Sequence, residues 1–278
     1  MSFISAEELS SRLDDDELSI IDVSWYHPGE GRDAGQEFIA QRLPGAIHVS
    51  LERLGRPAAS LPHTLPEPQA LARTLGEAGV GNTQDVVVYD ASGMRSAPRL
   101  WWLLRWLGHR RVRVLDGGLR RWRALGLPLH SGPPPTPAPV VFEPRPGCMP
   151  VVSVEQVRVA LRSGEPQVVD ARPSERFRGV APEPWPGLRQ GHMPGSRNLP
   201  LDRLLDIETG AMLPRSQVLE VLDAAQIDPS QSVIATCGSG VAAAGIVMVM
   251  EWLGGRGLLY DGSWCEWGAR QDLPVVCE

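Results

Sequence analysis

Residues 232–237 read Ser-Val-Ile-Ala-Thr-Cys, and residues 85–90 read Asp-Val-Val-Val-Tyr-Asp. In each stretch the apolar residues follow one another without alternation, which is typical of a central strand buried on both faces of a parallel sheet. Each stretch is followed by a turn that contains glycine and by an apolar segment of helix length, at residues 98–107 and 241–253. This order of strand, turn and helix predicts an α/β fold in each half of the chain.

The two stretches belong to a longer internal repeat. The landmarks that recur in the same order are Asp22 with Asp170, residues 43–46 with 193–196, Asp90 with Cys237, and residues 115–118 with 260–263. A chain of 278 residues is long enough for two domains that each bury a core. We therefore expect two tandem domains, 1–130 and 149–278, each with a mostly parallel central sheet flanked by helices.

The stretch between these domains, residues 131–148, is rich in proline. Its first part, residues 131–139, reads Ser-Gly-Pro-Pro-Pro-Thr-Pro-Ala-Pro. Proline lacks the backbone N–H that helices and sheets require, so such a segment favours an extended and semi-rigid conformation. We predict that this stretch is a linker.

The charged residues exclude several classes of function. All 27 basic residues are arginine, so the chain has no lysine for a Schiff base, a phosphate-binding loop or a general base. The formal net charge is −6, whereas proteins that bind nucleic acid concentrate positive charge against the phosphates. Nucleic acid is therefore not an expected partner.

The sequence shows neither a targeting segment nor a disulfide framework. Its N-terminus lacks the basic region and apolar run of a signal peptide, and no apolar stretch reaches the ~18 residues that a membrane span needs. We expect a cytoplasmic protein with no membrane partner. The four cysteines, Cys148, Cys237, Cys265 and Cys277, form no Cys-x-x-Cys pair, so we expect free thiols. Cys148, Cys265 and Cys277 are not followed by a loop comparable with the one after Cys237, and they are interpreted as structural.

Cys237 stands where the two halves differ, because the first half has Asp90 at the matching position. Ligands of open α/β sheets bind beyond the carboxyl ends of the strands, and Cys237 follows the central strand directly. The glycines after it let the backbone curl so that N–H groups point inward, and a helix N-terminus favours the thiolate. We predict Cys237 as a nucleophile in a backbone cradle formed by Gly238, Gly240, Val241 and Ala242.

Four motifs carry a resemblance to a known family. They are Gly191-His192-Met193-Pro194-Gly195, Asp170-Ala171-Arg172, Tyr260-Asp261-Gly262-Ser263-Trp264 and Leu115-Asp116-Gly117-Gly118. Through them the chain resembles the tandem-domain sulfurtransferases of the rhodanese superfamily over essentially its whole length. The resemblance implies that Cys237 carries sulfur as a persulfide, that the first domain is catalytically silent with Asp90 in place of cysteine, and that no metal or organic cofactor is needed. His192 and Asp170 are interpreted as structural.

Within this superfamily the loop Cys-Gly-Ser-Gly-Val resembles 3-mercaptopyruvate sulfurtransferases. Thiosulfate sulfurtransferases usually carry Arg and Lys where this chain has Gly238 and Ser239. Because thiosulfate is a dianion, it requires fixed positive charge near the sulfur, which this loop does not supply. The resemblance favours 3-mercaptopyruvate as donor and a thiol such as thioredoxin, or cyanide in an assay, as acceptor. Thiosulfate:cyanide transfer is the alternative.

The resemblance also implies a set of residues that moves protons, namely Glu52, His63 and Ser239. His63 precedes a Leu-Pro pair, as the family histidine does. Glu52 replaces the more usual Asp, and the alternative is that this side chain is merely a solvent-exposed charge.

For the substrate carboxylate the resemblance implies Arg176, since a guanidinium binds a carboxylate through two parallel hydrogen bonds. A second family arginine commonly ends a Glu-Pro-Arg sequence, but this chain has Trp185 there. Arg189 is the substitute that we predict, with Arg178 as the alternative.

Two other functions occur in proteins of this fold class, a phosphatase and a sulfur carrier, and the sequence bears on both. A phosphatase of this fold would need an arginine six positions after the cysteine, where the chain has Ala243 instead. A sulfur carrier or regulatory module with little turnover is the non-enzymatic alternative, and Trp185 and Glu52 are the residues that favour it.

Overall fold

The computed structural model describes residues 2–57, 59–134, 136–145, 147 and 149–277, so the prediction for Cys148 lies outside the described residues. The chain forms two compact units. The first consists of Met1–Ala58, Leu65–Met149 and Ile207–Met212, and the second of Ala59–Thr64, Pro150–Asp206 and Leu213–Glu278. The short segment Ala59–Thr64 therefore belongs with the second half of the chain, although it lies within the first half of the sequence.

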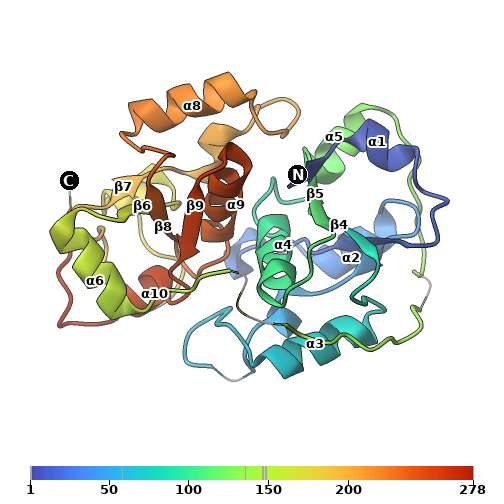
Figure 1. Cartoon of the computed structure of the whole chain (residues 1–278), viewed down its shortest axis with the longest axis horizontal. Coiled ribbons are helices and arrows are strands. Elements are labelled where there is room, and N and C mark those ends of the chain that lie inside the picture. The colour runs from blue at the N-terminus through green and yellow to red at the C-terminus, as the bar shows by residue number, and fades with distance from the viewer. Residues whose placement is uncertain (1, 58, 135, 146, 148, 278) are drawn as a thin grey trace. The chain divides into compact units, whose positions relative to one another are not determined.

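The first unit contains a parallel sheet with the strand order β1-β5-β4-β2-β3 (Figure 1). Its strands are β1 (Phe3–Ile4), β2 (Leu18–Asp22), β3 (Ile47–His48), β4 (Asp85–Tyr89) and β5 (Val112–Leu115). Its helices are α1 (Ala6–Ser10), α2 (Ala34–Ala40), α3 (Pro68–Glu77), α4 (Ala97–Trp106) and α5 (Gly118–Ala124), with 3-10 turns at Pro28–Glu30 and Leu51–Leu54. The strand β4 lies in the centre, as its unbroken apolar run predicts.

The second unit repeats this plan with the strand order β7-β6-β8-β9, again parallel. Its strands are β6 (Gln167–Asp170), β7 (Arg197–Asn198), β8 (Ser232–Thr236) and β9 (Arg256–Leu259). Its helices are α6 (Val154–Ser163), α7 (Ser174–Phe177), α8 (Arg215–Ala224), α9 (Ala243–Leu253) and α10 (Ser263–Trp267), with a 3-10 turn at Leu201–Leu204. Figure 1 shows that helices flank this sheet. The predicted fold class, two α/β domains with parallel sheets, is confirmed.

The apolar patterns of the sequence account for the core of the second unit. Residues 233–235 of β8 are buried, and so are all residues of α9 from Ala243 to Met250. A helix that is apolar around its whole circumference is stable only in an interior. At Gly245 a side chain would meet Leu201 at 2.5 Å, so glycine allows this helix to pack closely on the turn Leu201–Leu204. None of the helices in the described ranges is long and apolar enough to cross a membrane.

The proline-rich segment packs along the first unit. Its described residues form no helix or strand. Val140 donates a backbone hydrogen bond to the carbonyl of Gly76 (2.9 Å), and the backbone N–H of Glu143 donates to Asn82 Oδ1 (2.7 Å). The segment is therefore fixed to the unit that precedes it, and its role as a linker stays a prediction.

Candidate active site

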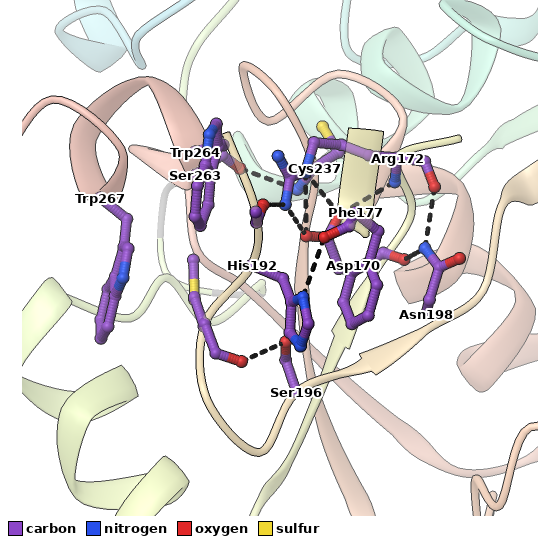
Figure 2. A network of polar contacts seen from close by, with 12 residues as sticks. Asp170, Arg172, Phe177, His192, Ser196, Asn198, Cys237, Ser263, Trp264 and Trp267 are labelled. Atoms are coloured by element: carbon purple, nitrogen blue, oxygen red, sulfur yellow. Dashed lines mark hydrogen bonds and ion pairs between the residues drawn. The ribbon is translucent and has the colours of Figure 1, made fainter. Parts of the chain in front are cut away.

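Cys237 directly follows β8, and the N-terminus of α10 fixes its backbone. The Cys237 N–H donates to Ser263 Oγ (3.1 Å), and this hydroxyl donates in turn to the carbonyl of Tyr260 (2.8 Å). The carbonyl of Cys237 accepts a hydrogen bond from the N–H of Trp264 (2.9 Å). Figure 2 shows Ser263 and Trp264 beside the cysteine. The two neighbouring loops therefore determine the position of the thiol, which belongs to a residue only 3% exposed.

The loop between β8 and α9 surrounds the sulfur with backbone N–H groups. Those of Ser239, Gly240 and Ala243 hydrogen bond to the Cys237 thiol. Gly240 has φ +79°, and a side chain there would approach the carbonyl oxygen of Asp261 to 2.8 Å, so the turn requires glycine. The sequence predicted a cradle here and named Gly240, but it did not name Ala243. The sequence did indicate Ala243 indirectly, because this residue begins the helix α9 and the first N–H groups of a helix have no partner within the helix.

Burial acts against the thiolate. It raises the pKa of Cys237 above the ordinary value, and the charge of Asp170 acts in the same direction. The three cradle N–H groups lower the pKa, but their effect is smaller than that of burial. The backbone N–H groups at the start of α9 thus favour the thiolate, as predicted, but burial outweighs their effect on the pKa.

Ser239 and His63 lie next to the cradle. His63 Nδ1 is 3.0 Å from Ser239 Oγ, within hydrogen-bond distance, and Ser239 is 5% exposed. His63 comes from the segment Ala59–Thr64, which belongs to the same unit as Cys237, and it has φ +55°. A non-glycine residue with positive φ is uncommon and marks a tightly constrained turn. Two of the three residues predicted to move protons are therefore neighbours in space.

Glu52, the third member of that set, belongs to the 3-10 turn Leu51–Leu54 of the first unit. Its side chain is exposed and accepts a hydrogen bond from the hydroxyl of Ser50. Its part in proton transfer stays a prediction.

The arginines predicted to bind substrate differ in what they contact. Arg176 on α7 is half-buried, and its guanidinium forms no hydrogen bond or salt bridge with any residue that the structure describes. Arg189 donates from Nε to the carbonyl of Gly268 (3.1 Å), from Nη1 to Leu273 (2.9 Å), and from Nη2 to Trp267 and Arg270. These hydrogen bonds hold the chain at the end of α10 and beyond, which argues against the predicted role of Arg189 at the substrate. Arg178 is exposed.

A buried network beneath the cysteine supports the site (Figure 2). Arg172 forms salt bridges with Asp170 (2.8 Å) and Glu183 (2.7 Å), and its guanidinium lies 4.1 Å from the centre of the Trp264 ring. Burial raises the pKa of Glu183, while the charges of Arg172 and Arg176 lower it. Arg176 is thus close enough to Glu183 to affect its charge, although the two side chains do not form a salt bridge.

The motif residue His192 has a structural partner. Its Nδ1 lies 2.8 Å from the carbonyl oxygen of Phe177, and the two rings are stacked with centres 3.8 Å apart. Figure 2 shows both rings side by side. Asp170 is engaged by Arg172, so the contacts of both motif residues match the structural interpretation.

Comparison with known proteins adds information that the geometry alone lacks. The profile of the rhodanese-like domain matches residues 5–125 and 153–270. The 3-mercaptopyruvate sulfurtransferase of Escherichia coli (strain K12) is 37% identical over 278 residues, which cover 98% of this chain and 97% of that protein. The thiosulfate sulfurtransferase of Bos taurus is also 37% identical, over 254 residues that cover 90% and 84%. The crystal structure of SseA from Escherichia coli, described as a 3-mercaptopyruvate sulfotransferase with the rhodanese fold, superposes with a TM-score of 0.86 at 33% identity and covers 95% of this chain and 99% of its own.

Proposed function

The chain belongs to the family of rhodanese-like domain proteins, and from this premise we propose that it is a sulfurtransferase that moves sulfur from 3-mercaptopyruvate to a thiol through a persulfide on Cys237. In this proposal the domain of residues 149–278 is catalytic and the domain of residues 1–130 is silent, with residues 131–148 as linker. The acceptor is a thiol of the thioredoxin class in the cytoplasm.

The observation that carries the proposal is the set of hydrogen-bonding groups around the Cys237 sulfur. Three backbone N–H groups hydrogen bond to this thiol, and the Ser239–His63 pair lies beside it. Backbone N–H groups fixed in advance stabilise the charge that develops on sulfur during transfer, and a persulfide anion is such a charge. An adjacent hydroxyl and imidazole supply a route for a proton.

The reaction follows from this arrangement. The Cys237 thiolate attacks the sulfur of 3-mercaptopyruvate, and a sulfur–sulfur bond forms while the carbon–sulfur bond breaks. The electron pair of the broken bond leaves with the carbon as the enolate of pyruvate, which takes a proton through Ser239 and His63. Arg176 holds the substrate carboxylate with its uncommitted guanidinium. The acceptor thiol then takes the outer sulfur and returns Cys237 to its reduced form.

The electrostatics of the loop after Cys237 favour 3-mercaptopyruvate over thiosulfate as the sulfur donor. Identity does not separate the two donor classes, because relatives of both are 37% identical to the chain. The loop 238–242 contains no charged side chain, so a dianion such as thiosulfate gains little there. Thiosulfate:cyanide transfer is the second candidate, and comparing kcat/KM for the two donors with one acceptor decides between them.

Mass spectrometry of the intact protein tests the proposal. After treatment with 3-mercaptopyruvate, without an acceptor, the protein gains one sulfur atom, which peptide mapping locates on Cys237. The Cys237→Ser variant neither gains sulfur nor releases pyruvate, whereas the Cys265→Ser variant does both as the wild type does. If pyruvate is released while Cys237 stays unmodified, the persulfide mechanism is wrong. Sulfur uptake without repeated pyruvate release would instead favour the low-turnover carrier.

A further inference from the structure

We infer that Trp185 is a positioning and specificity-determining residue of the donor site, which holds the His63 ring and selects donors with one negative charge over dianionic donors. The inference rests on the proposed function. It concerns 2-oxo thiols with a single carboxylate as the favoured class and sulfane dianions such as thiosulfate as the disfavoured class.

The contacts of Trp185 connect it to the reactive sulfur. Its ring meets the His63 ring in an edge-to-face arrangement, with centres 6.1 Å apart and planes at 74°. His63 Nδ1 lies 3.0 Å from Ser239 Oγ, and the Ser239 N–H bonds to the Cys237 thiol. Edge-to-face contacts between aromatic rings favour one relative orientation. The indole therefore restricts the orientation of the imidazole that the proposed proton route uses.

The segment that carries Trp185 is well suited to hold it in place. Pro184 and Pro186 flank the residue and fix the backbone φ on either side. Glu183, which precedes Pro184, forms a salt bridge with Arg172 (2.7 Å), and the side chains of Glu183 and Arg172 are both 1% exposed. A functional side chain needs a rigid support of this kind, since small displacements weaken catalysis.

The indole N–H shows that the ring is not placed by a hydrogen bond. Trp185 Nε1 is buried and has no partner among the residues that the structure describes. A buried donor without a partner is unfavourable, and natural proteins retain few of them. The ring is therefore placed by packing, which includes its edge-to-face contact with His63.

The charged side chains near Trp185 explain why an uncharged residue at this position affects the choice of donor. Four arginines lie between residues 172 and 189. Arg172 is paired with Asp170 and Glu183, the donors of Arg189 bind carbonyl oxygens, and Arg178 is exposed. Of these four, Arg176 alone is half-buried with a guanidinium that has no hydrogen bond or salt bridge to any described residue. One positive charge balances a monocarboxylate, whereas the second charge of thiosulfate would stay uncompensated in a partly desolvated site.

The charge part of the inference is tested with a matched pair, Trp185→Arg and Trp185→Gln. We measure kcat/KM for 3-mercaptopyruvate and for thiosulfate with cyanide as acceptor. The arginine variant shifts the ratio toward thiosulfate by about tenfold or more relative to the glutamine variant, and the shift shrinks as ionic strength rises. If both variants are folded by circular dichroism and have the same ratio, the charge argument is overturned.

The positioning part is tested with Trp185→Phe and Trp185→Ala. Phenylalanine keeps a ring against His63 and retains kcat with 3-mercaptopyruvate to within about threefold. Alanine removes the ring, lowers kcat by about tenfold or more and alters the pH profile of kcat, because His63 loses its support. An unchanged kcat and pH profile in a folded alanine variant would overturn this role. Failure of the proposed function is distinguishable, because then the wild type itself transfers no sulfur from either donor.

Discussion

Asp90 and Cys237 stand at matching positions, each directly after the central strand of its sheet, and each receives hydrogen bonds from the backbone of the loop that follows. Asp90 Oδ1 accepts from the N–H groups of Ser92 (2.9 Å) and Met94 (3.0 Å). Asp90 Oδ2 accepts from those of Ser96 (3.0 Å) and Ala97 (2.7 Å). In the first unit a carboxylate fills the kind of cradle that surrounds the thiol in the second. This unit thus holds a carboxyl group where the other unit would carry sulfur.

The first prediction concerns the stability of the first unit. Replacing Asp90 by alanine leaves four backbone N–H groups, three of them buried, without this acceptor, so the free energy of unfolding falls by on the order of 3 kcal/mol. Asp90→Asn retains one carbonyl oxygen and costs roughly half as much. Urea unfolding of both variants measures the difference. A loss below about 0.5 kcal/mol for Asp90→Ala would show that the cradle does not depend on its anion.

The second prediction concerns the pH dependence of thiol reactivity. Because burial raises the pKa of Cys237, less of this thiol is ionised at pH 7 than of an ordinary exposed thiol. Its alkylation by iodoacetamide is therefore slow at pH 7 and accelerates only at a higher pH than that of an ordinary exposed thiol, since only the thiolate reacts. Burial raises the pKa of Cys265 to about 12, so Cys265 is also slow to react, and exposed Cys277 reacts first. Peptide mapping over a pH series checks this order, which a fast reaction of Cys237 at pH 6 would contradict.

The sequence was sufficient to predict the fold and the place of Cys237 at the end of the central strand. The unbroken apolar runs before Asp90 and Cys237 reflect burial on both faces of a parallel sheet, and glycine in the loop reflects a turn that no other residue fits. Both signals are local, because they depend on neighbours along the chain. The strand–loop–helix around Cys237 could therefore be predicted without knowledge of the tertiary structure.

The remaining features depend on contacts between distant segments. Arg189 was predicted to bind the substrate from its place in the sequence. In the structure its guanidinium donates to backbone carbonyls that follow α10, a long-range contact that the sequence does not reveal. The pKa of Cys237 depends on burial by the whole domain, which outweighs the local effect of the helix N-terminus. The contact of Trp185 with His63 joins residues more than a hundred positions apart, and no periodicity indicates it.

The third prediction treats Ser239 and His63 as one unit. Ser239→Ala and His63→Gln each lower kcat with 3-mercaptopyruvate by about 10²-fold or more, because each interrupts the same proton route. The double variant is about as slow as the slower single variant, since residues that act together are not additive. Steady-state pyruvate release in a double-mutant cycle measures this. Independent effects that multiply in the double variant would mean that the hydrogen bond between the two residues has no role in turnover.

The last prediction separates the two arginines that the sequence had grouped together. Arg176→Gln raises KM for 3-mercaptopyruvate by roughly 10- to 100-fold, the value of charge-assisted hydrogen bonds to a carboxylate, and leaves the melting temperature unchanged. Arg189→Gln has the opposite pattern, because its lost contacts are with the carbonyls of residues 267–273: the protein melts at a lower temperature, and KM of the folded fraction stays as in the wild type. Thermal unfolding and donor titration of the two variants, made side by side, check both halves of the statement. An Arg189 variant with normal stability and a raised KM would restore Arg189 to the substrate site and remove the argument that Arg176 binds the carboxylate alone.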